Sequence, residues 1–111
     1  MSDPFGLLRT ASSGMDAQRA ALDISARNVA AAEAAGKDGS YERMVPNFTL
    51  VRDGDTQLIR VAGSHAEAGS SVDILTEMIS VMNASRAYEA NASVFDVGKR
   101  LAERAIDLGR A

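Results

Sequence analysis

The chain has no cysteine and no tryptophan, only two prolines and a single histidine among its 111 residues. Without cysteine it cannot form a disulfide, a zinc–thiolate site or a thiol nucleophile. One imidazole is too few for a metal site, which needs three or four ligands. The chain also lacks the basic and apolar regions of a secretory signal peptide, and no apolar run approaches the ~20 residues that span a bilayer. We therefore expect no metal, no other cofactor, no cleaved signal peptide and no membrane insertion.

Large apolar side chains are scarce as well. Twenty residues are alanine, whereas Leu, Ile, Val and Phe together number 24, about 22% of the chain. That fraction is just above the ~20% region in which compact folding becomes doubtful. The 12 basic and 15 acidic residues interleave along the chain and form no basic cluster, so we expect no nucleic-acid binding. This composition favours helices with small, closely packed side chains over a bulky core.

Residues 1–36 are expected to form an N-terminal helix. Asp3 can cap the helix, Pro4 suits its first position and Gly36 can end it. Large residues recur every seven positions, which is the spacing of a supercoiled helix seam: Leu8, Met15, Leu22 and Val29. A neighbouring row is small, and its Gly14 costs about 1 kcal/mol relative to Ala in a helix. We expect another backbone to approach closely there.

Residues 37–70 are expected to form a short β-hairpin followed by a loop. A β-prone stretch runs over 41–51, the pair Asp53-Gly54 signals a turn, and a second β-prone stretch follows the turn. Gly, Ser, Ala and Glu dominate residues 63–71, which we interpret as a loop that exposes His65.

Residues 71–111 are expected to form a second, longer helix. Its large residues again recur every seven positions, and another row follows them: Ile74, Val81, Tyr88 and Phe95, then Leu101. The two helices would be roughly 48 and 57 Å long, whereas a compact domain of this size has a radius of gyration of only ~13 Å. We therefore predict a mainly α fold, with two long terminal helices in a coiled-coil-like hairpin and a short β-hairpin between them. Neighbouring subunits would complete this single elongated unit, and each helix would turn a stripe of small residues toward them.

Motifs in both helices carry a family resemblance. The residues concerned are Ser13, Gly14, Met15 and Asn28 in the first helix and Ser85, Arg86, Ala87, Tyr88, Ala90 and Asn91 in the second. The pattern resembles the bacterial flagellar basal-body rod proteins, a family of axial proteins, and most closely its proximal-rod members. Arg27 and Ala31 stand where the Asn-rich box of that family usually has Asn.

The resemblance implies a structural rod subunit that serves motility and is not an enzyme. Members pass unfolded through the flagellar type III export apparatus without cleavage and become part of the periplasmic rod of the basal body. The partners implied are other copies of the chain, other rod proteins and the export apparatus. The assembly interface that we predict consists of the seven-residue rows: Leu8, Met15, Leu22, Val29, Ile74, Val81, Tyr88, Phe95 and Leu101.

Other functions remain compatible with parts of the sequence. A helical adaptor or export chaperone of a type III secretion system would also show heptads, as would a small secreted helical-hairpin protein, although the absence of Trp counts against the latter. Catalysis is disfavoured because one histidine and no phosphate-cradling Gly loop offer little chemistry. For Tyr88, packing within the chain and contact between subunits are equally compatible with its position.

Overall fold

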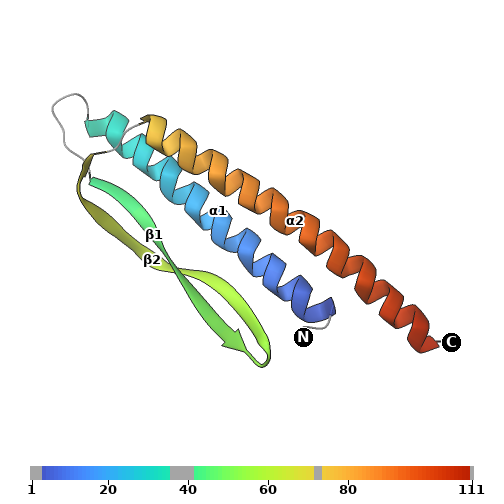
Figure 1. Cartoon of the computed structure of the whole chain (residues 1–111). Helices are drawn as coiled ribbons and strands as arrows, with labels where there is room; N and C mark the ends of the chain where they lie inside the picture. Colours follow the sequence, from blue (N-terminus) through green and yellow to red (C-terminus); the bar gives the residue numbers. More distant parts are fainter. Residues whose placement is uncertain (1–3, 36–41, 72–73, 111) are drawn as a thin grey trace.

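In the computed structural model the elements follow one another as helix, strand, strand and helix (Figure 1). The structure describes residues 4–35, 42–71 and 74–110. Its elements are α1 (Pro4–Ala35), β1 (Glu42–Asp53), β2 (Thr56–Ser71) and α2 (Ile74–Arg110). The predicted fold class, two long helices with an antiparallel β-hairpin between them, is confirmed. The expected caps at Asp3 and Gly36 lie outside the described residues.

The hairpin is longer than we expected, and the interpretation of residues 63–71 as a loop is wrong. They form the second half of β2, which pairs with β1 in antiparallel register. The ladder continues through a bulge in β2, where Ala62 and Gly63 lie opposite Asn47 alone, and the φ of 125° at Gly63 suits only glycine. The predicted turn is confirmed, and Gly54 there has a φ of 64°.

His65 consequently stands in a strand. It lies opposite Val45 in the ladder, and its exposed ring contacts the side chain of Asn47 through Nδ1. The reading of His65 as a loop residue is therefore wrong, although its exposure is as expected.

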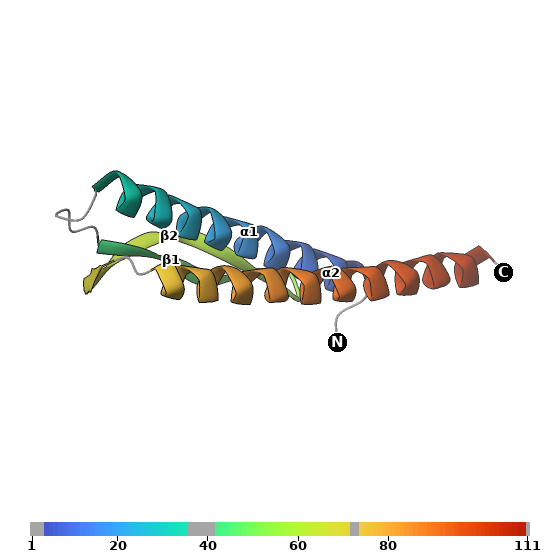
Figure 2. The ribbon, with the colours of Figure 1, turned by 90° about the horizontal axis from the view of Figure 1, so that it is seen from above.

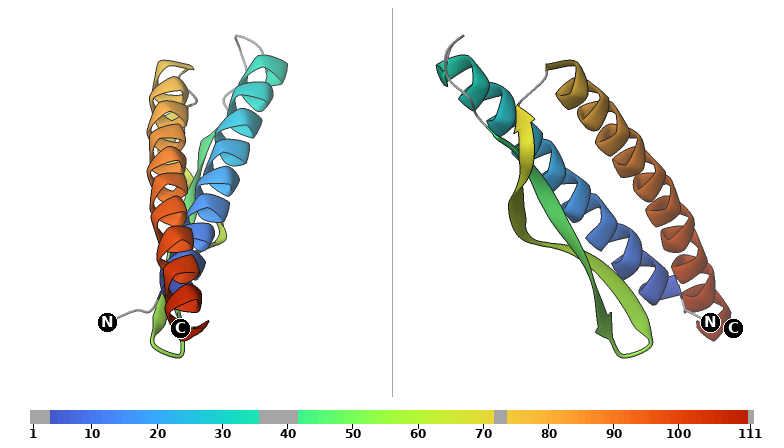
Figure 3. Two further views of the ribbon diagram at one scale, coloured as in Figure 1. Left: turned by 90° about the vertical axis from the view of Figure 1, so that its right-hand side faces the viewer. Right: turned by 60° about the vertical axis from the view of Figure 1, so that its left-hand side comes forward.

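Helix α1 packs both against α2 and against the two strands (Figures 1 and 3). The helices are antiparallel, and the end of α2 extends past the start of α1 (Figure 2). The molecule measures 69 × 23 × 16 Å and its radius of gyration is 18.2 Å. Because a compact chain of this length would have a value of only ~13 Å, the predicted elongation is confirmed.

Small residues build the contact between the helices. The buried positions on the two helices include Ala11, Gly14, Ala17, Ala84, Gly98 and Ala102. A Cβ on Gly14 would lie only 2.7 Å from the Nδ2 atom of Asn91, and one on Gly98 would lie 3.2 Å from Cδ2 of Leu8. The expectation that the small stripes face another subunit is therefore wrong, because they face each other within the chain. A side chain, rather than a backbone, occupies the space beside Gly14.

Candidate assembly surface and the polar clasp

A buried polar cluster joins the four elements at one end of the molecule. We call it the polar clasp, and its members are Asn28 of α1, Arg43 of β1, Glu67 of β2, and Glu77 and Ser80 of α2. Asn28 is completely buried, and the exposed fraction of Glu77 is 1%. Two such polar side chains are stable in an interior only when they are hydrogen-bonded.

Asn28 connects the hairpin to both helices. Its Nδ2 donates to the Met44 carbonyl at 2.9 Å and to Oε1 of Glu77 at 3.0 Å, and its Oδ1 accepts from the Met44 N–H at 3.0 Å. On this side β1 is an edge strand with no neighbouring strand. The Asn28 amide therefore supplies the hydrogen bonds that the Met44 backbone would otherwise lack.

Arg43 supplies the cation that the buried carboxylate of Glu77 requires. Its Nε donates to Oε1 of Glu77 at 2.7 Å, its Nη2 to Oγ of Ser80 at 2.7 Å, and its Nη1 to Oε2 of Glu67 at 3.1 Å. Burial lowers the pKa of Arg43, but the hydrogen bonds and negative charges of Glu77 and Glu67 outweigh it, so the pKa is raised above its ordinary value. The guanidinium is thus charged at any pH at which the protein folds.

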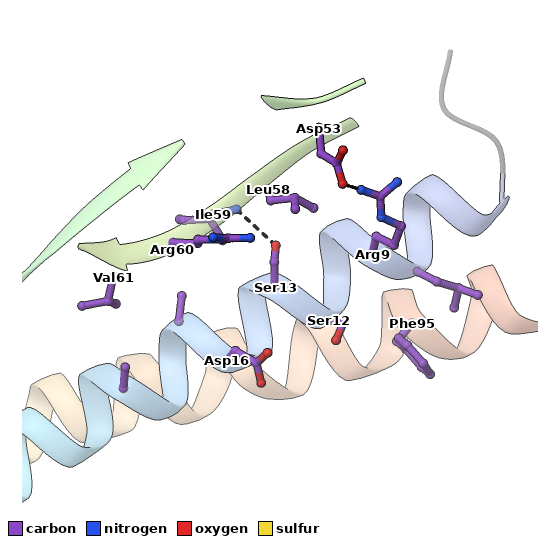
Figure 4. A pocket seen from close by; sticks show the side chains of 13 residues that line it. Arg9, Ser12, Ser13, Asp16, Asp53, Leu58, Ile59, Arg60, Val61 and Phe95 are labelled. Carbon is purple, nitrogen blue, oxygen red and sulfur yellow. Dashed lines mark hydrogen bonds and ion pairs between the residues drawn. The ribbon is translucent and has the colours of Figure 1, made fainter. Parts of the chain in front are cut away.

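The tip of the hairpin docks on the first half of α1. Oγ1 of Thr10 donates to the Gln57 carbonyl at 3.0 Å. Oγ of Ser13 accepts from the Ile59 N–H at 3.1 Å (Figure 4). An ion pair between Arg9 and Asp53 lies beside them. These contacts border a groove of about 750 Å³ whose lining mixes Ser, Asp and Arg with apolar residues and contains no histidine.

The outer side of α2 carries two apolar patches. The head patch comprises Leu75, Met78, Ile79 and Met82, whose exposed fractions are 52–68%. The tail patch comprises Val94, Val97, Leu101 and Leu108, whose exposed fractions are 40–77%. Contiguous apolar surface of this kind marks an interaction site rather than ordinary surface. Of these eight, only Leu101 belongs to the assembly interface predicted from the sequence. The spacing of three, four and seven in the head patch is nevertheless the signal of an amphipathic face.

The described residues offer little for chemistry on small molecules. They contain no group of three His, Asp or Glu residues placed to hold a metal ion. Neither of the two helices described has a stretch that is long and apolar enough to cross a bilayer.

Comparison with known proteins agrees with this reading. Residues 64–108 match the family model described as "Flagellar basal body rod FlgEFG protein C-terminal". A second match is the "Flagellar basal-body rod protein FlgC" of Aquifex aeolicus (strain VF5), at 28% identity over 96% of this chain and 98% of the relative. The chain is thus similar to flagellar basal-body rod proteins over residues 64–108 and, at low identity, over nearly its whole length. Both similarities support a structural role in a flagellar basal-body rod.

The rod-family signature residues lie largely where α1 and α2 meet. Gly14 and Asn91 face each other across the helices, and Asn28 is the centre of the polar clasp. The hydroxyl of Tyr88 lies 3.3 Å from Nη2 of Arg19, whose guanidinium is 6.0 Å from the ring centroid. This hydrogen bond raises the pKa of Arg19. Of the two interpretations of Tyr88, the structure therefore favours packing within the chain.

The predicted assembly rows border the helix–helix contact. On α1 all four members are half-buried, and on α2 so are Tyr88 and Phe95. Val81 and Leu101 are 37% and 44% exposed, whereas Ile74 opens α2 and its side chain is outside the description. The structure brings Leu22 to Tyr88 in one hollow and Val29 to Val81 in another. The rows thus leave only part of their apolar surface for a neighbour.

Arg43, Glu77 and Ser80 were missed as functional residues by sequence reasoning. A signal does exist for Glu77, because Glu77, Ala84, Asn91 and Gly98 recur every seven residues and three of them are small or polar. A charged residue in register with a small row indicates a buried charge that needs a partner.

Proposed function

We propose that this chain is a rod subunit of the proximal-rod type that polymerises through its terminal helices in the periplasmic rod and is required for motility. The observation that carries the proposal is the outer face of α2, where eight large apolar side chains are at least 40% exposed while small residues turn inward. A helix that faces its own chain with alanine and glycine and faces outward with leucine and methionine is built to be covered by other subunits.

The proposal includes export in an unfolded state through the flagellar type III apparatus, with other rod proteins and copies of this chain as partners. The small number of large buried side chains supports it. Leu58 is the only large apolar residue with less than 9% exposure in the described part of the chain. Unfolding before export therefore exposes little buried apolar surface and costs little free energy. The segments 1–36, 37–70 and 71–111 would act as one structural unit. In this proposal the partly exposed members of the predicted rows, Val81 and Leu101, are assembly contacts.

The test is incorporation into basal bodies. Ile79→Asp places a charge on the head patch at a side chain that is 59% exposed, so folding should survive but burial against a neighbour should not. Leu50→Asp is the matched control, since Leu50 is 68% exposed on β1, away from α2. We expect Ile79→Asp to abolish incorporation and swimming while exported protein stays at the wild-type level.

Leu50→Asp should incorporate and swim almost normally. Equal motility of the two variants, with both folded by circular dichroism, would mean that α2 is not the assembly surface. Retention of the wild-type chain in the cytosol as a stable dimer would instead favour an adaptor or chaperone.

A further inference from the structure

One row of residues on each helix forms the middle of the contact between α1 and α2. Both rows take every seventh residue, and the antiparallel helices place the start of one row opposite the end of the other (Figure 2). We call the two rows together the register row. Its four facing pairs are Leu7 with Gly98, Gly14 with Asn91, Ala21 with Ala84 and Asn28 with Glu77.

Two of these pairs match a larger side chain with a glycine. A Cβ on Gly98 would lie 3.4 Å from Cδ2 of Leu7, and a Cβ on Gly14 would lie 2.7 Å from Nδ2 of Asn91. The larger partner comes from α1 in the first pair and from α2 in the second. Each helix therefore leaves space where the other carries a larger side chain.

The other two pairs match in polarity and in size. Nδ2 of Asn28 donates to Oε1 of Glu77 at 3.0 Å, and both side chains are at most 1% exposed. Ala21 and Ala84, which are both small, line the same hollow of about 400 Å³. All four pairs are thus complementary in the observed register.

The large apolar rows beside the register row do not specify a register. They carry Leu, Met, Leu and Val on α1 and Ile, Val, Tyr and Phe on α2, again at heptad spacing. A shift of one helix by seven residues, about 10 Å, turns the same faces together and again places apolar residues side by side. Burial of these rows therefore favours a contact between the helices but no particular alignment.

A shift of seven residues in either direction breaks the register row. Shifted one way, Glu77 is buried against Ala21 without its amide and guanidinium partners, which strongly disfavours the charge. Shifted the other way, Glu77 faces Ala35 at the end of α1, again without those partners. The second shift also turns the Asn91 side chain toward the Cβ of Ala21, where the observed register provides a glycine.

We propose that the register row is a recognition code by which α1 selects α2, in one register and against other helices. A helix fits this code only where its row carries Glu, Ala, Asn and Gly in that order at heptad spacing. In the described part of the chain α2 alone carries that order. The code concerns pairing within one chain and goes beyond the proposed rod role, on which it does not depend.

Rewriting the row should move the helix. In a shifted-row variant the order Glu, Ala, Asn and Gly is moved by one heptad toward the end of α2. The five substitutions are Glu77→Ala, Ala84→Glu, Asn91→Ala, Gly98→Asn and Ala105→Gly. We expect α2 to slide along α1 by seven residues, about 10 Å, so that the relocated carboxylate meets Asn28.

Spin labels measure the slide, since the chain has no cysteine of its own. Ala30→Cys and Glu103→Cys place one label on an exposed site of each helix. In the observed register these sites are roughly 42 Å apart along the helix axis, and after the slide roughly 32 Å. Double electron–electron resonance is recorded on the labelled full-length chain diluted in unlabelled chain, at a concentration at which the chain is helical.

The original row should give a single label distance, and the shifted row a single distance shorter by roughly 10 Å. A control variant carries Glu89→Ala and Asp96→Ala, two exposed carboxylates of α2 that lie one heptad apart outside the row. It should keep the original distance. A helical shifted-row variant that also keeps the original distance would overturn the code, since the covalent connection of α2 to β2 would then set the register.

An exchange variant tests the code without moving α2, and it decides the matter if the shifted-row variant is not helical by circular dichroism. Gly14→Asn alone should lower the melting temperature, because two amides then compete for one space. Combined with Asn91→Gly, it should recover most of that loss, because the pair is again one amide and one glycine. Additive losses in the double variant would overturn the code. Entry of the wild-type chain into basal bodies tests the rod role separately from all of these results.

Discussion

At the scale of single residues, the most consequential positions are polar. Asn28 and Glu77 are the largest side chains with less than 2% exposure in the described part of the chain. Arg43 compensates the negative charge of Glu77. A buried ion pair is no proof of net stabilisation, because desolvation offsets much of the attraction. The cost appears when one partner is removed, since the other is then left charged in the interior.

Arg43→Met should therefore lower the free energy of unfolding by roughly 3 kcal/mol, the low end for a broken buried pair, because Arg43 itself is 17% exposed. Urea unfolding followed by circular dichroism measures the change, at a protein concentration at which the wild-type chain is fully helical. Arg27→Met is the matched control, since Arg27 forms only an exposed pair with Asp23 at i,i+4 spacing and should change the value by less than about 0.5 kcal/mol. Equal losses for the two variants would mean that the clasp does not hold the elements together.

The raised pKa of Arg43 also has a consequence for pH. The pKa of Arg43 is higher in the folded than in the unfolded chain. The contribution of Arg43 to stability is therefore fully present below the unfolded-state pKa and is lost only as pH rises through the folded-state pKa. Both pKa values of Arg43, folded and unfolded, are reached only in strongly alkaline solution. Between pH 9 and 11, above the range in which an unpaired buried carboxylate takes up a proton, wild-type protein and the Arg43→Met variant should therefore differ in unfolding free energy by a constant amount. A difference that changes across this range in urea titrations would contradict the assignment.

At the scale of elements, the approach of α1 to α2 depends on glycine. In an isolated helix Gly14→Ala would gain about 1 kcal/mol from helix propensity. Here the new Cβ would meet the Asn91 side chain at 2.7–2.9 Å, and that side chain is held by a 3.0 Å hydrogen bond from Nδ2 to the Ala87 carbonyl. Overpacking then costs about 1–3 kcal/mol.

Gly14→Ala should therefore destabilise the chain, by about 1–2 kcal/mol after the propensity gain is included. The double variant Gly14→Ala/Asn91→Ala should recover most of the loss, because the obstructing amide is gone. Gly109→Ala serves as the control, since nothing lies within 4 Å of its Cβ position. Thermal melts of wild type, the single variants Gly14→Ala and Asn91→Ala and the double variant give the double-mutant cycle. A Gly14→Ala variant as stable as wild type would contradict close packing at this point.

At the scale of the whole molecule, the chain is long, thin and poor in large buried side chains. Its apolar surface is turned outward on α2, so in the proposed assembly neighbouring subunits would supply much of its stabilisation. Ordering the backbone costs about 1–2 kcal/mol per residue, and a contact between two rows of alanine and glycine offsets little of that cost through apolar burial.

We therefore expect the purified wild-type chain to be weakly helical at low concentration and to gain helicity and hydrogen-exchange protection in α2 as concentration rises, by mass action. Circular dichroism and hydrogen exchange across a hundredfold dilution measure this. A cooperative melt that does not depend on concentration, with strong protection in α2 throughout, would indicate a self-sufficient fold and favour the adaptor.

The sequence by itself determined the elements and the overall shape. Proline at the start of α1, heptad spacing in both helices and a turn pair in the hairpin are local signals, and local signals set element type. The length of two unbroken helices made an elongated molecule unavoidable. The family resemblance likewise rested on contiguous motifs, such as the run from Ser85 to Asn91.

Only the tertiary structure decided which faces turn inward. A heptad pattern predicts a seam but does not say whether the large or the small row is used within the chain, because both recur every seven residues. The hairpin's second half was equally beyond local reading, since its Gly-Ser-Ala composition is that of a loop until Gly63 allows a bulge and β1 supplies the hydrogen bonds. The polar clasp depends on residues from four elements, and such a constellation exists only once the chain has folded.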